Sequence, residues 1–259
     1  MIEAKIYTEL LPYPNKENRK ILIYVPEHNE GEKLPVVYML DGQNLFDEFP
    51  TMFGSWGVTE TVKNEQKSGA GGAVIVGVDN GNERRDCELT PDCIGEVQLR
   101  ELLCENFKPE GEIFDNFMIN TVVPFVEARY PVKTDRKNTA VCGSSSGGLM
   151  AFYAGVEHSE KFSIIGALSP AFLCYTQNDW RKYLTEKIKP DMPYLYIYTG
   201  GGDELEQMIF ESVEMMYELL PETGYPYDMM NEIVLFENKH NEGAWREIFK
   251  DFLHTFLTR

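Results

Sequence analysis

The chain of 259 residues is 43% hydrophobic and carries a formal net charge of −18, with an isoelectric point of about 4.6. This length and apolar content suit one α/β domain with a sizeable core, and we expect a single domain over residues 1–259. Nucleic acids and anionic membranes are held by basic patches, so a chain this acidic is expected to bind neither.

The cysteines predict the compartment. Their number is odd, and no basic stretch followed by an apolar run precedes them, so we expect reduced thiols and a cytoplasmic protein. Cys87 and Cys93 are not spaced as zinc ligands, and no nearby histidine completes a set, so neither a metal nor another cofactor is expected. No apolar run reaches the length of a membrane span. The five cysteines are Cys87, Cys93, Cys104, Cys142 and Cys174.

The first half of the chain predicts strands separated by a helix and polar loops. Residues 20–26 alternate and indicate an early, half-exposed strand. Residues 35–40 and 73–78 are continuous apolar runs, as in strands buried on both faces of a sheet. A helix is expected at residues 56–65. Residues 82–111 are charged with weak periodicity, and we interpret them as an excursion over the face where the strands end.

The second half continues the alternation of strands and helices. Apolar residues at helical spacing over residues 114–130 predict a core helix with a kink at Pro124. A helix at residues 205–220 is expected to stop at Pro221, and a last helix is expected at residues 244–257. Because strands and amphipathic helices alternate, we expect an α/β fold with a mostly parallel sheet and helices on both faces. The remaining strands are expected at residues 139–142, 162–168, 194–198 and 232–236.

Residues 143–147, Gly-Ser-Ser-Ser-Gly, stand between a predicted strand and a predicted helix. The pattern Gly-x-Ser-x-Gly in that setting is typical of a nucleophile elbow, where small neighbours let strand and helix come close around a strained serine. Of the three consecutive serines, only Ser145 has a glycine both two residues before and two residues after it. The sequence therefore predicts Ser145 as the nucleophile; the alternative is an ordinary turn.

Two further loops after predicted strands supply the other groups that acyl transfer needs. Ser145, Asp203 and His240 occur in the chain order typical of α/β-hydrolases. His240 would accept the serine proton, and Asp203 would orient the imidazole. Glu204 could take the place of Asp203, and both acids could instead cap the helix that follows them.

An oxyanion hole needs two backbone N–H groups. We expect one from Ser146, at the start of the helix after the predicted nucleophile. The other is expected from the loop at residues 41–44, with the N–H of Gln43 or Asn44 as the donor. An ordinary glycine turn is the competing interpretation of this loop.

Seven motifs follow one another along the chain. They are YMLDGQNLF at 38–46, SWGV at 55–58, IVGVDNGNERR at 75–85, CGSSSGGLMAFYAG at 142–155, SPAF at 169–172, YTGGGDE at 198–204 and HNEGAWR at 240–246. With them the chain resembles the putative esterase family of α/β-hydrolases from about Lys20 to the C-terminus. That family includes feruloyl and acetyl-xylan esterases, S-formylglutathione hydrolase-like enzymes and siderophore trilactone esterases. The resemblance implies Ser145, Asp203 and His240 as nucleophile, acid and base, and the Gln43 region as oxyanion loop.

Two departures from the family pattern bear on the site. The acid motif has three glycines before two consecutive acids, which keeps Glu204 as an alternative to Asp203. After the paired arginines, where relatives have a tyrosine and a proline-containing run, residues 86–91 read Asp-Cys-Glu-Leu-Thr-Pro. The substrate of the relatives therefore does not carry over.

Aromatic and polar residues near the expected strand ends are candidates for the substrate pocket. Aromatic surfaces with a few polar groups suit a sugar or phenolic ester. In the competing interpretation, the tryptophans pack in the core and the arginines pair with nearby acids. The main candidates are Trp56, Asn80, Arg84 and Trp180, and the further ones are Asp79, Arg85, Phe172 and Trp245.

The sequence predicts a serine carboxylic-ester hydrolase that forms an acyl-enzyme on acylated carbohydrates or phenolic esters. A siderophore trilactone esterase is the alternative. A net charge of −18 disfavours the basic patch that an anionic catecholate complex needs, although Arg84 and Arg85 could supply a local one. A non-catalytic binding protein on a hydrolase scaffold is the alternative of another class. Such proteins usually lose a member of the triad, and here all three residue types are present.

Overall fold

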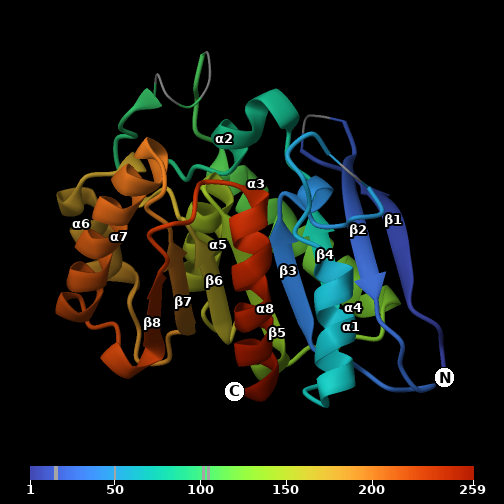
Figure 1. Cartoon of the computed structure of the whole chain (residues 1–259). Coiled ribbons are helices and arrows are strands. Elements are labelled where there is room, and N and C mark those ends of the chain that lie inside the picture. Colours follow the sequence, from blue (N-terminus) through green and yellow to red (C-terminus); the bar gives the residue numbers. More distant parts are fainter. Residues whose placement is uncertain (15–16, 50, 101–102, 104–105) are drawn as a thin grey trace.

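Eight strands form one sheet in the computed structural model, which describes residues 1–259 except 15–16, 50, 101–102 and 104–105. The order across the sheet is β1-β2-β4-β3-β5-β6-β7-β8 (Figure 1). Strands β3 to β8 run parallel, and β2 and β1 extend one edge in antiparallel pairing. The strands are β1 (Lys5–Leu11), β2 (Arg19–Val25), β3 (Val36–Leu40), β4 (Val74–Val78), β5 (Thr139–Ser144), β6 (Ile164–Leu168), β7 (Tyr194–Thr199) and β8 (Met230–Val234).

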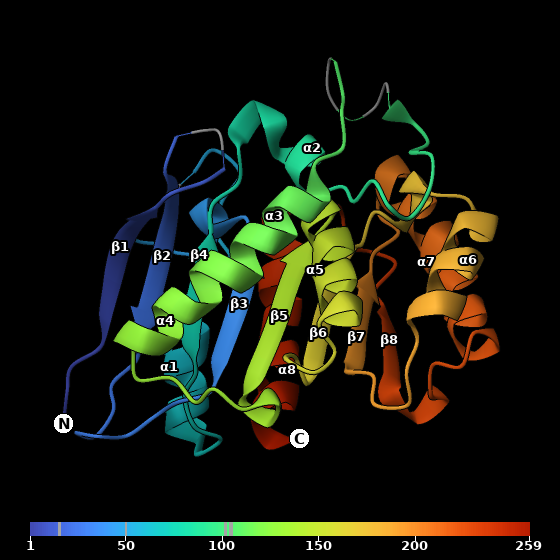
Figure 2. The same ribbon diagram turned by 180° about the vertical axis from the view of Figure 1, so that it is seen from behind.

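Helices cover both faces of this sheet. α1 and α8 lie on one face (Figure 1), and α3, α4 and α5 lie on the other (Figure 2), where α6 and α7 share a core with α5. The expected α/β fold with a mostly parallel sheet between helices is confirmed. The helices are α1 (Val58–Ser68), α2 (Arg85–Glu88), α3 (Gly111–Phe117), α4 (Val123–Arg129), α5 (Ser146–Glu157), α6 (Gln177–Lys187), α7 (Glu204–Glu222) and α8 (Glu242–Thr258).

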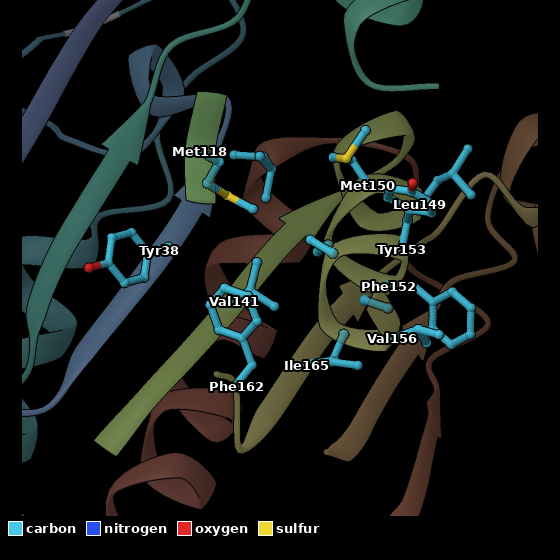
Figure 3. Packing of buried hydrophobic residues seen from close by; sticks show 14 of the residues in the cluster. Tyr38, Met118, Val141, Leu149, Met150, Phe152, Tyr153, Val156, Phe162 and Ile165 are labelled. Atoms are coloured by element: carbon cyan, nitrogen blue, oxygen red, sulfur yellow. The ribbon is translucent and has the colours of Figure 1, made fainter. Parts of the chain in front are cut away.

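The core lies on both sides of the central strands, because successive residues of a strand point to opposite faces. On one side, Phe152 and Val156 of α5 belong to the same buried cluster as Val141 of β5 and Ile165 of β6 (Figure 3). On the other side, α8 packs aromatic side chains such as Phe249 against the sheet. The burial of α5 fixes the position of the loop that precedes it.

The N-terminal edge differs from the expectation. The sequence does not predict β1, because polar and apolar residues are mixed there, and it predicts β2 as half-exposed. β1 pairs along the whole of β2, from Lys5 opposite Val25 to Leu11 opposite Arg19. This pairing covers β2, which is buried at nearly every position.

The predicted helix over residues 114–130 contains an irregular turn. It consists of α3, a π-helical turn at Met118–Val122, and α4. Pro124 has no N–H for a helical hydrogen bond, and in a regular helix its ring would crowd the carbonyl of Asn120, four residues earlier. The wider turn just before the proline accommodates this, so the expected irregularity takes the form of a π turn.

Three elements of the C-terminal half differ from the expectation. α6 is not predicted; it begins with a capping box between Thr176 and Asp179. α7 runs one residue past Pro221, the expected stop, so this proline lies in the last turn of the helix. β8 begins two residues earlier than expected, since Met230 already pairs with β7.

Candidate active site

Ser145 stands at the sharp turn between β5 and α5, where the sequence predicts the nucleophile. Its dihedral angles, φ 58° and ψ −126°, lie in a region that costs an L-residue about 1–3 kcal/mol. Its N–H donates to the carbonyl oxygen of Leu168 (2.9 Å), and its own carbonyl accepts from the N–H of Ala171 (3.1 Å). A Cβ atom on Gly143 would lie 2.3 Å from the carbonyl oxygen of Gly147, so the turn requires glycine there.

Hydrogen bonds join Ser145, His240 and Glu206. The serine Oγ lies 3.0 Å from Nε2 of His240, and Nδ1 of His240 lies 2.8 Å from Oε1 of Glu206. A carboxylate oxygen only accepts, so Nδ1 carries the proton and Nε2 accepts from the serine hydroxyl. The Glu206 side chain is fully buried, and the side chain of His240 is 14% exposed. This order of serine, imidazole and carboxylate can activate a serine hydroxyl.

The carboxylate on the imidazole is neither Asp203 nor Glu204. Asp203 caps α7: its Oδ1 accepts from the N–H of Glu206 (2.9 Å), and its Oδ2 accepts from the backbone N–H of His240 (2.9 Å). Glu204 opens α7 and is exposed. Glu206, the third residue of α7, reaches the imidazole ring instead. The interpretation of Asp203 as a helix cap is therefore correct, and its predicted side-chain contact with the ring is wrong.

Glu206 is held by several hydrogen-bond donors. Its Oε2 accepts from the N–H of Gly200 (2.9 Å) and the hydroxyl of Thr199 (3.1 Å), at the end of β7. Burial raises the pKa of Glu206, but hydrogen bonds from His240, Ser169 and Gly200 outweigh it, and the pKa lies below its ordinary value. The buried carboxyl therefore favours its ionised form.

Trp245 of α8 supports the imidazole from another direction. Its ring stands edge-on to that of His240, with 4.9 Å between the centroids and 88° between the planes. Its indole N–H donates to Oγ of Ser169 (3.1 Å), which also bonds Glu206. The imidazole is thus held in orientation both by the hydrogen bond from Nδ1 to Glu206 and by the indole ring of Trp245.

The loop after β3 brings a predicted oxyanion donor to the site. The N–H of Asn44 donates to the carbonyl oxygen of Asp41 (2.9 Å) and is therefore engaged. The N–H groups of Gln43 and Ser146 lie in the first turns of the short 3₁₀ helix η1 (Gly42–Asn44) and of α5, where no intrahelical acceptor exists. Of the two expected donors in this loop, Gln43 is the one left to bind an oxyanion.

An ion-pair cluster joins this loop to the elbow. Nε and Nη2 of Arg85 lie 2.8 and 2.7 Å from the two carboxylate oxygens of Asp41, and Nη2 also donates to the carbonyl of Ser144 (3.2 Å). Nη1 donates to Oδ1 of Asp86 (3.1 Å), which accepts from the hydroxyl of Ser146 (2.8 Å). We refer to Asp41, Arg85 and Asp86 as the clamp. Both Arg85 and Asp86 belong to the segment that the sequence predicts as an excursion over this face.

Ser145 and His240 line a pocket of about 650 Å³. Part of its wall is aromatic: Trp56 and Trp245 are buried behind it, and Phe53 is exposed at its rim. Apolar walls with a few fixed polar groups are typical of small-molecule sites. The polar part of the lining consists of Asp41, Gln43, Asn44, Thr51, Asn80, Asn82, Arg85, Ser144 and Glu242.

The structure places half of the predicted pocket residues in this lining, namely Trp56, Asn80, Arg85 and Trp245. Trp180 is fully buried on the inner side of α6, with its indole N–H on the carbonyl of Phe172, itself buried (2.9 Å). Arg84 pairs with Glu110 (2.6 Å), and Asp79 pairs with a lysine of β2. Trp180 and Arg84 therefore lie outside the pocket: Trp180 is a core residue of an unpredicted helix, and Arg84 turns toward an acid.

The sequence does not single out Glu206 or Glu242. A helix-start signal at Asp203 would have marked that residue as the cap and left Glu206, one turn on, as the acid facing the strand ends. Glu242 follows His240 by two residues, and nothing in the sequence distinguishes it from an ordinary first-turn acid.

Further observations concern metals, membranes and thiols. In the part of the chain that the structure describes, no group of three or more His, Cys, Asp or Glu side chains could hold a metal ion. Across the same residues, no helix is both long and apolar enough to cross a membrane. Cys93, Cys142 and Cys174 are free thiols, and Cys104 lies outside the described residues.

The sheet, the elbow and the serine–imidazole–carboxylate contacts together define a serine ester hydrolase of the α/β class. The chain belongs to the Putative esterase family, which it matches over residues 14–208. The family resemblance seen in the sequence motifs is thereby confirmed.

Similar proteins act on different esters. The siderophore triacetylfusarinine C esterase of Aspergillus fumigatus is 27% identical over 226 residues, which cover 75% of this chain and 70% of that protein. The solved structure of the siderophore hydrolase EstA from Aspergillus nidulans matches with a TM-score of 0.76 at 20% identity. The match covers 98% of this chain and 94% of the EstA chain. A ferulic acid esterase has a TM-score of 0.71 at 19% identity, with 99% of both chains covered. At these identities the two structures show a shared fold.

Proposed function

We propose that the protein hydrolyses carboxylic esters of sugars or phenolic acids through an acyl-enzyme on Ser145. His240 is the base, and Glu206 is the acid of the triad. The observation that carries this proposal is the unbroken run of hydrogen bonds from Ser145 through His240 to the buried Glu206. Asp203 contributes by holding the backbone N–H of His240.

In the first half of the reaction, Oγ of Ser145 attacks the ester carbonyl carbon while its proton passes to Nε2 of His240. The bond to the alcohol oxygen then breaks, and the leaving alcohol takes that proton. In the second half, a water molecule gives a proton to Nε2 and attacks the acyl-enzyme, which releases the acid and restores the serine. Glu206 stays anionic, keeps Nδ1 protonated and stabilises the imidazolium.

The N–H groups of Gln43 and Ser146 receive the negative charge that develops on the carbonyl oxygen. Losing one donor of such a pair costs about 10²–10³-fold in kcat. The clamp (Asp41, Arg85 and Asp86) keeps the two groups at a fixed separation, because one guanidinium is bonded to both loops.

The pocket supports the class of substrate. Phe53 at the rim offers apolar surface to the ring of a sugar or a phenol, and Trp56 and Trp245 lie buried behind this wall. The amides of Asn44 and Asn80 can donate to or accept from ring hydroxyls. Similar proteins are named for ferulate esters, which belong to the proposed substrate class, and for siderophore esters, which are the alternative.

We propose that the protein resides in the cytoplasm, where the free thiols of Cys93, Cys142 and Cys174 stay reduced. Fractionation of the source cells checks this. Recovery of the native protein from the secreted fraction would contradict it.

Turnover of an ester panel tests the function. The panel contains p-nitrophenyl acetate, methyl ferulate, acetylated xylo-oligosaccharide and ferric enterobactin, each with wild type, Ser145→Ala and Ser144→Ala. We expect Ser145→Ala to lower kcat on the order of 10⁴-fold or more, and Ser144→Ala, the neighbouring serine, to retain activity. Hydrolysis of the ferulate or the sugar ester supports the substrate class, and hydrolysis of the siderophore alone moves the protein to the siderophore esterases. Full activity of Ser145→Ala refutes the mechanism.

A further inference from the structure

The ionisable side chains that line the pocket are Asp41, Arg85, His240 and Glu242. Arg85 carries the permanent positive charge among them. Each of its three side-chain nitrogen atoms already donates a hydrogen bond to another group of the protein. Its carboxylate partners are Asp41, which it meets through two bonds, and Asp86. The guanidinium charge is therefore neutralised within the clamp and does not offer a site for an anion.

Glu242 is the carboxylate of this lining that stands outside the clamp. Its Oε1 accepts from the side-chain amide of Asn44 (3.1 Å), and it forms no ion pair with any residue that the structure describes. It is 9% exposed and opens α8, two residues after His240. The pKa of Glu242 lies above its ordinary value: burial and nearby Asp41 raise it, whereas a hydrogen bond from its own backbone N–H and the neighbouring Arg85 and His240 lower it. The side chain is thus a partly desolvated acceptor in the pocket that Ser145 and His240 also line.

We propose that Glu242 makes the pocket selective by charge: it accepts a hydrogen bond from a hydroxyl or ammonium group of the substrate, and it excludes anionic esters. This inference rests on the esterase function proposed above. An anionic group in the pocket would meet Glu242 and a clamp that has two carboxylates for one guanidinium. At low local dielectric, such like charges repel more strongly than in water. A neutral polyol meets no such barrier, and a donor group satisfies the acceptor capacity that Asn44 leaves on Glu242.

The charge pattern also bears on the alternative of a siderophore trilactone esterase. Ferric catecholate complexes are anionic, and a basic patch favours their binding. Within the described lining, the positive charge of Arg85 is paired with the carboxylates of the clamp, and no lysine is present. The net charge of −18 adds repulsion at longer range. Neutral acylated sugars and phenolic esters therefore suit this pocket better than anionic siderophore complexes.

Three acetate esters of similar shape test the inference. They are acetylcholine, which is cationic, 3,3-dimethylbutyl acetate, which is neutral, and 2-acetoxyethanesulfonate, which is anionic. Each is measured as a substrate by acetate release and as a competitor of p-nitrophenyl acetate, so that binding is read even where turnover is slow. We expect kcat/KM and apparent affinity to be at least about tenfold lower for the anion than for the other two.

The variants are Glu242→Gln and Glu247→Gln. Glutamine at 242 still accepts from Asn44, so the contact survives while the charge is removed. Glu247 is exposed on the same helix and lies outside the pocket, and its substitution changes the net charge equally. We expect Glu242→Gln to shift the cation-to-anion ratio by about tenfold toward the anion. Glu247→Gln should leave that ratio within about twofold.

The outcomes separate this inference from the function on which it rests. Equal hydrolysis and binding of the three acetates by the wild type would overturn the charge selectivity, and so would matching ratios in Glu242→Gln and Glu247→Gln. In both cases Ser145-dependent hydrolysis of p-nitrophenyl acetate shows that the esterase function stands. Absence of that hydrolysis would contradict both the proposed esterase function and the inference about Glu242.

Discussion

Two acids at the start of α7 have separate tasks. Glu206 bonds Nδ1 of the imidazole, whereas Asp203 caps the helix and bonds the backbone N–H of His240. The sequence places acids after β7 but does not decide between them, because three acids fall within one helical turn. Which of them faces the ring depends on the residue at which the helix begins, and sequence patterns locate helix starts poorly.

Glu206→Gln and Asp203→Asn should therefore differ. We expect Glu206→Gln to lower kcat by about 10³–10⁴-fold, because an amide cannot hold the same imidazole tautomer or stabilise its charged form. Asparagine is itself a good helix cap, so Asp203→Asn should lose about tenfold or less. The measurement is kcat for p-nitrophenyl acetate, with the exposed Glu204→Gln as control. A larger loss in Asp203→Asn than in Glu206→Gln would contradict the assignment.

At the scale of elements, the clamp shows what the sequence could and could not predict. Parallel strands end at one edge of a sheet, so the order of strands and loops was enough to predict Ser145 and His240 on the same face. The direction of Arg85 was not predictable, because it depends on the short turn of η2 (Asn82–Arg84) and α2. Neighbouring Arg84 points to Glu110 instead.

The paired arginines offer a matched test of the clamp. Arg85→Ala leaves two partly buried carboxylates without their cation, and we expect it to lower the free energy of unfolding by about 3 kcal/mol. Arg84→Ala removes an ion pair whose arginine is 45% exposed, and it should cost less than about 1 kcal/mol. Denaturant unfolding of both variants gives the comparison. Equal losses would mean that the cluster contributes no more than a surface ion pair.

At the scale of the whole molecule, the alternation of strands and helices predicted the sheet and its covering layers. The prediction failed where tertiary contacts override local pattern. β1 has a mixed sequence and becomes a strand because the edge of β2 is there to pair with it. The sequence does not predict α6, and Trp180, which the sequence places among the pocket candidates, is a fully buried residue of this helix.

The net charge of −18 also acts on the molecule as a whole. Self-repulsion destabilises a compact state, and salt screens it over about 10 Å at 0.1 M. We expect the thermal unfolding midpoint to rise by a few degrees as sodium chloride increases from low concentration to about 0.3 M. Potassium chloride serves as the control for a specific ion effect. A midpoint that falls with both salts would show that attractive ion pairs dominate.

The most direct test of the central claim is to locate the acyl group during turnover. The enzyme is mixed with p-nitrophenyl acetate, quenched in acid, digested and mapped by mass spectrometry. We predict an acetyl group on Ser145 and on neither Ser144 nor Ser146, with none at this site in Ser145→Ala. Hydrolysis that proceeds with no acyl group on Ser145, or with the group on another residue, would contradict the account.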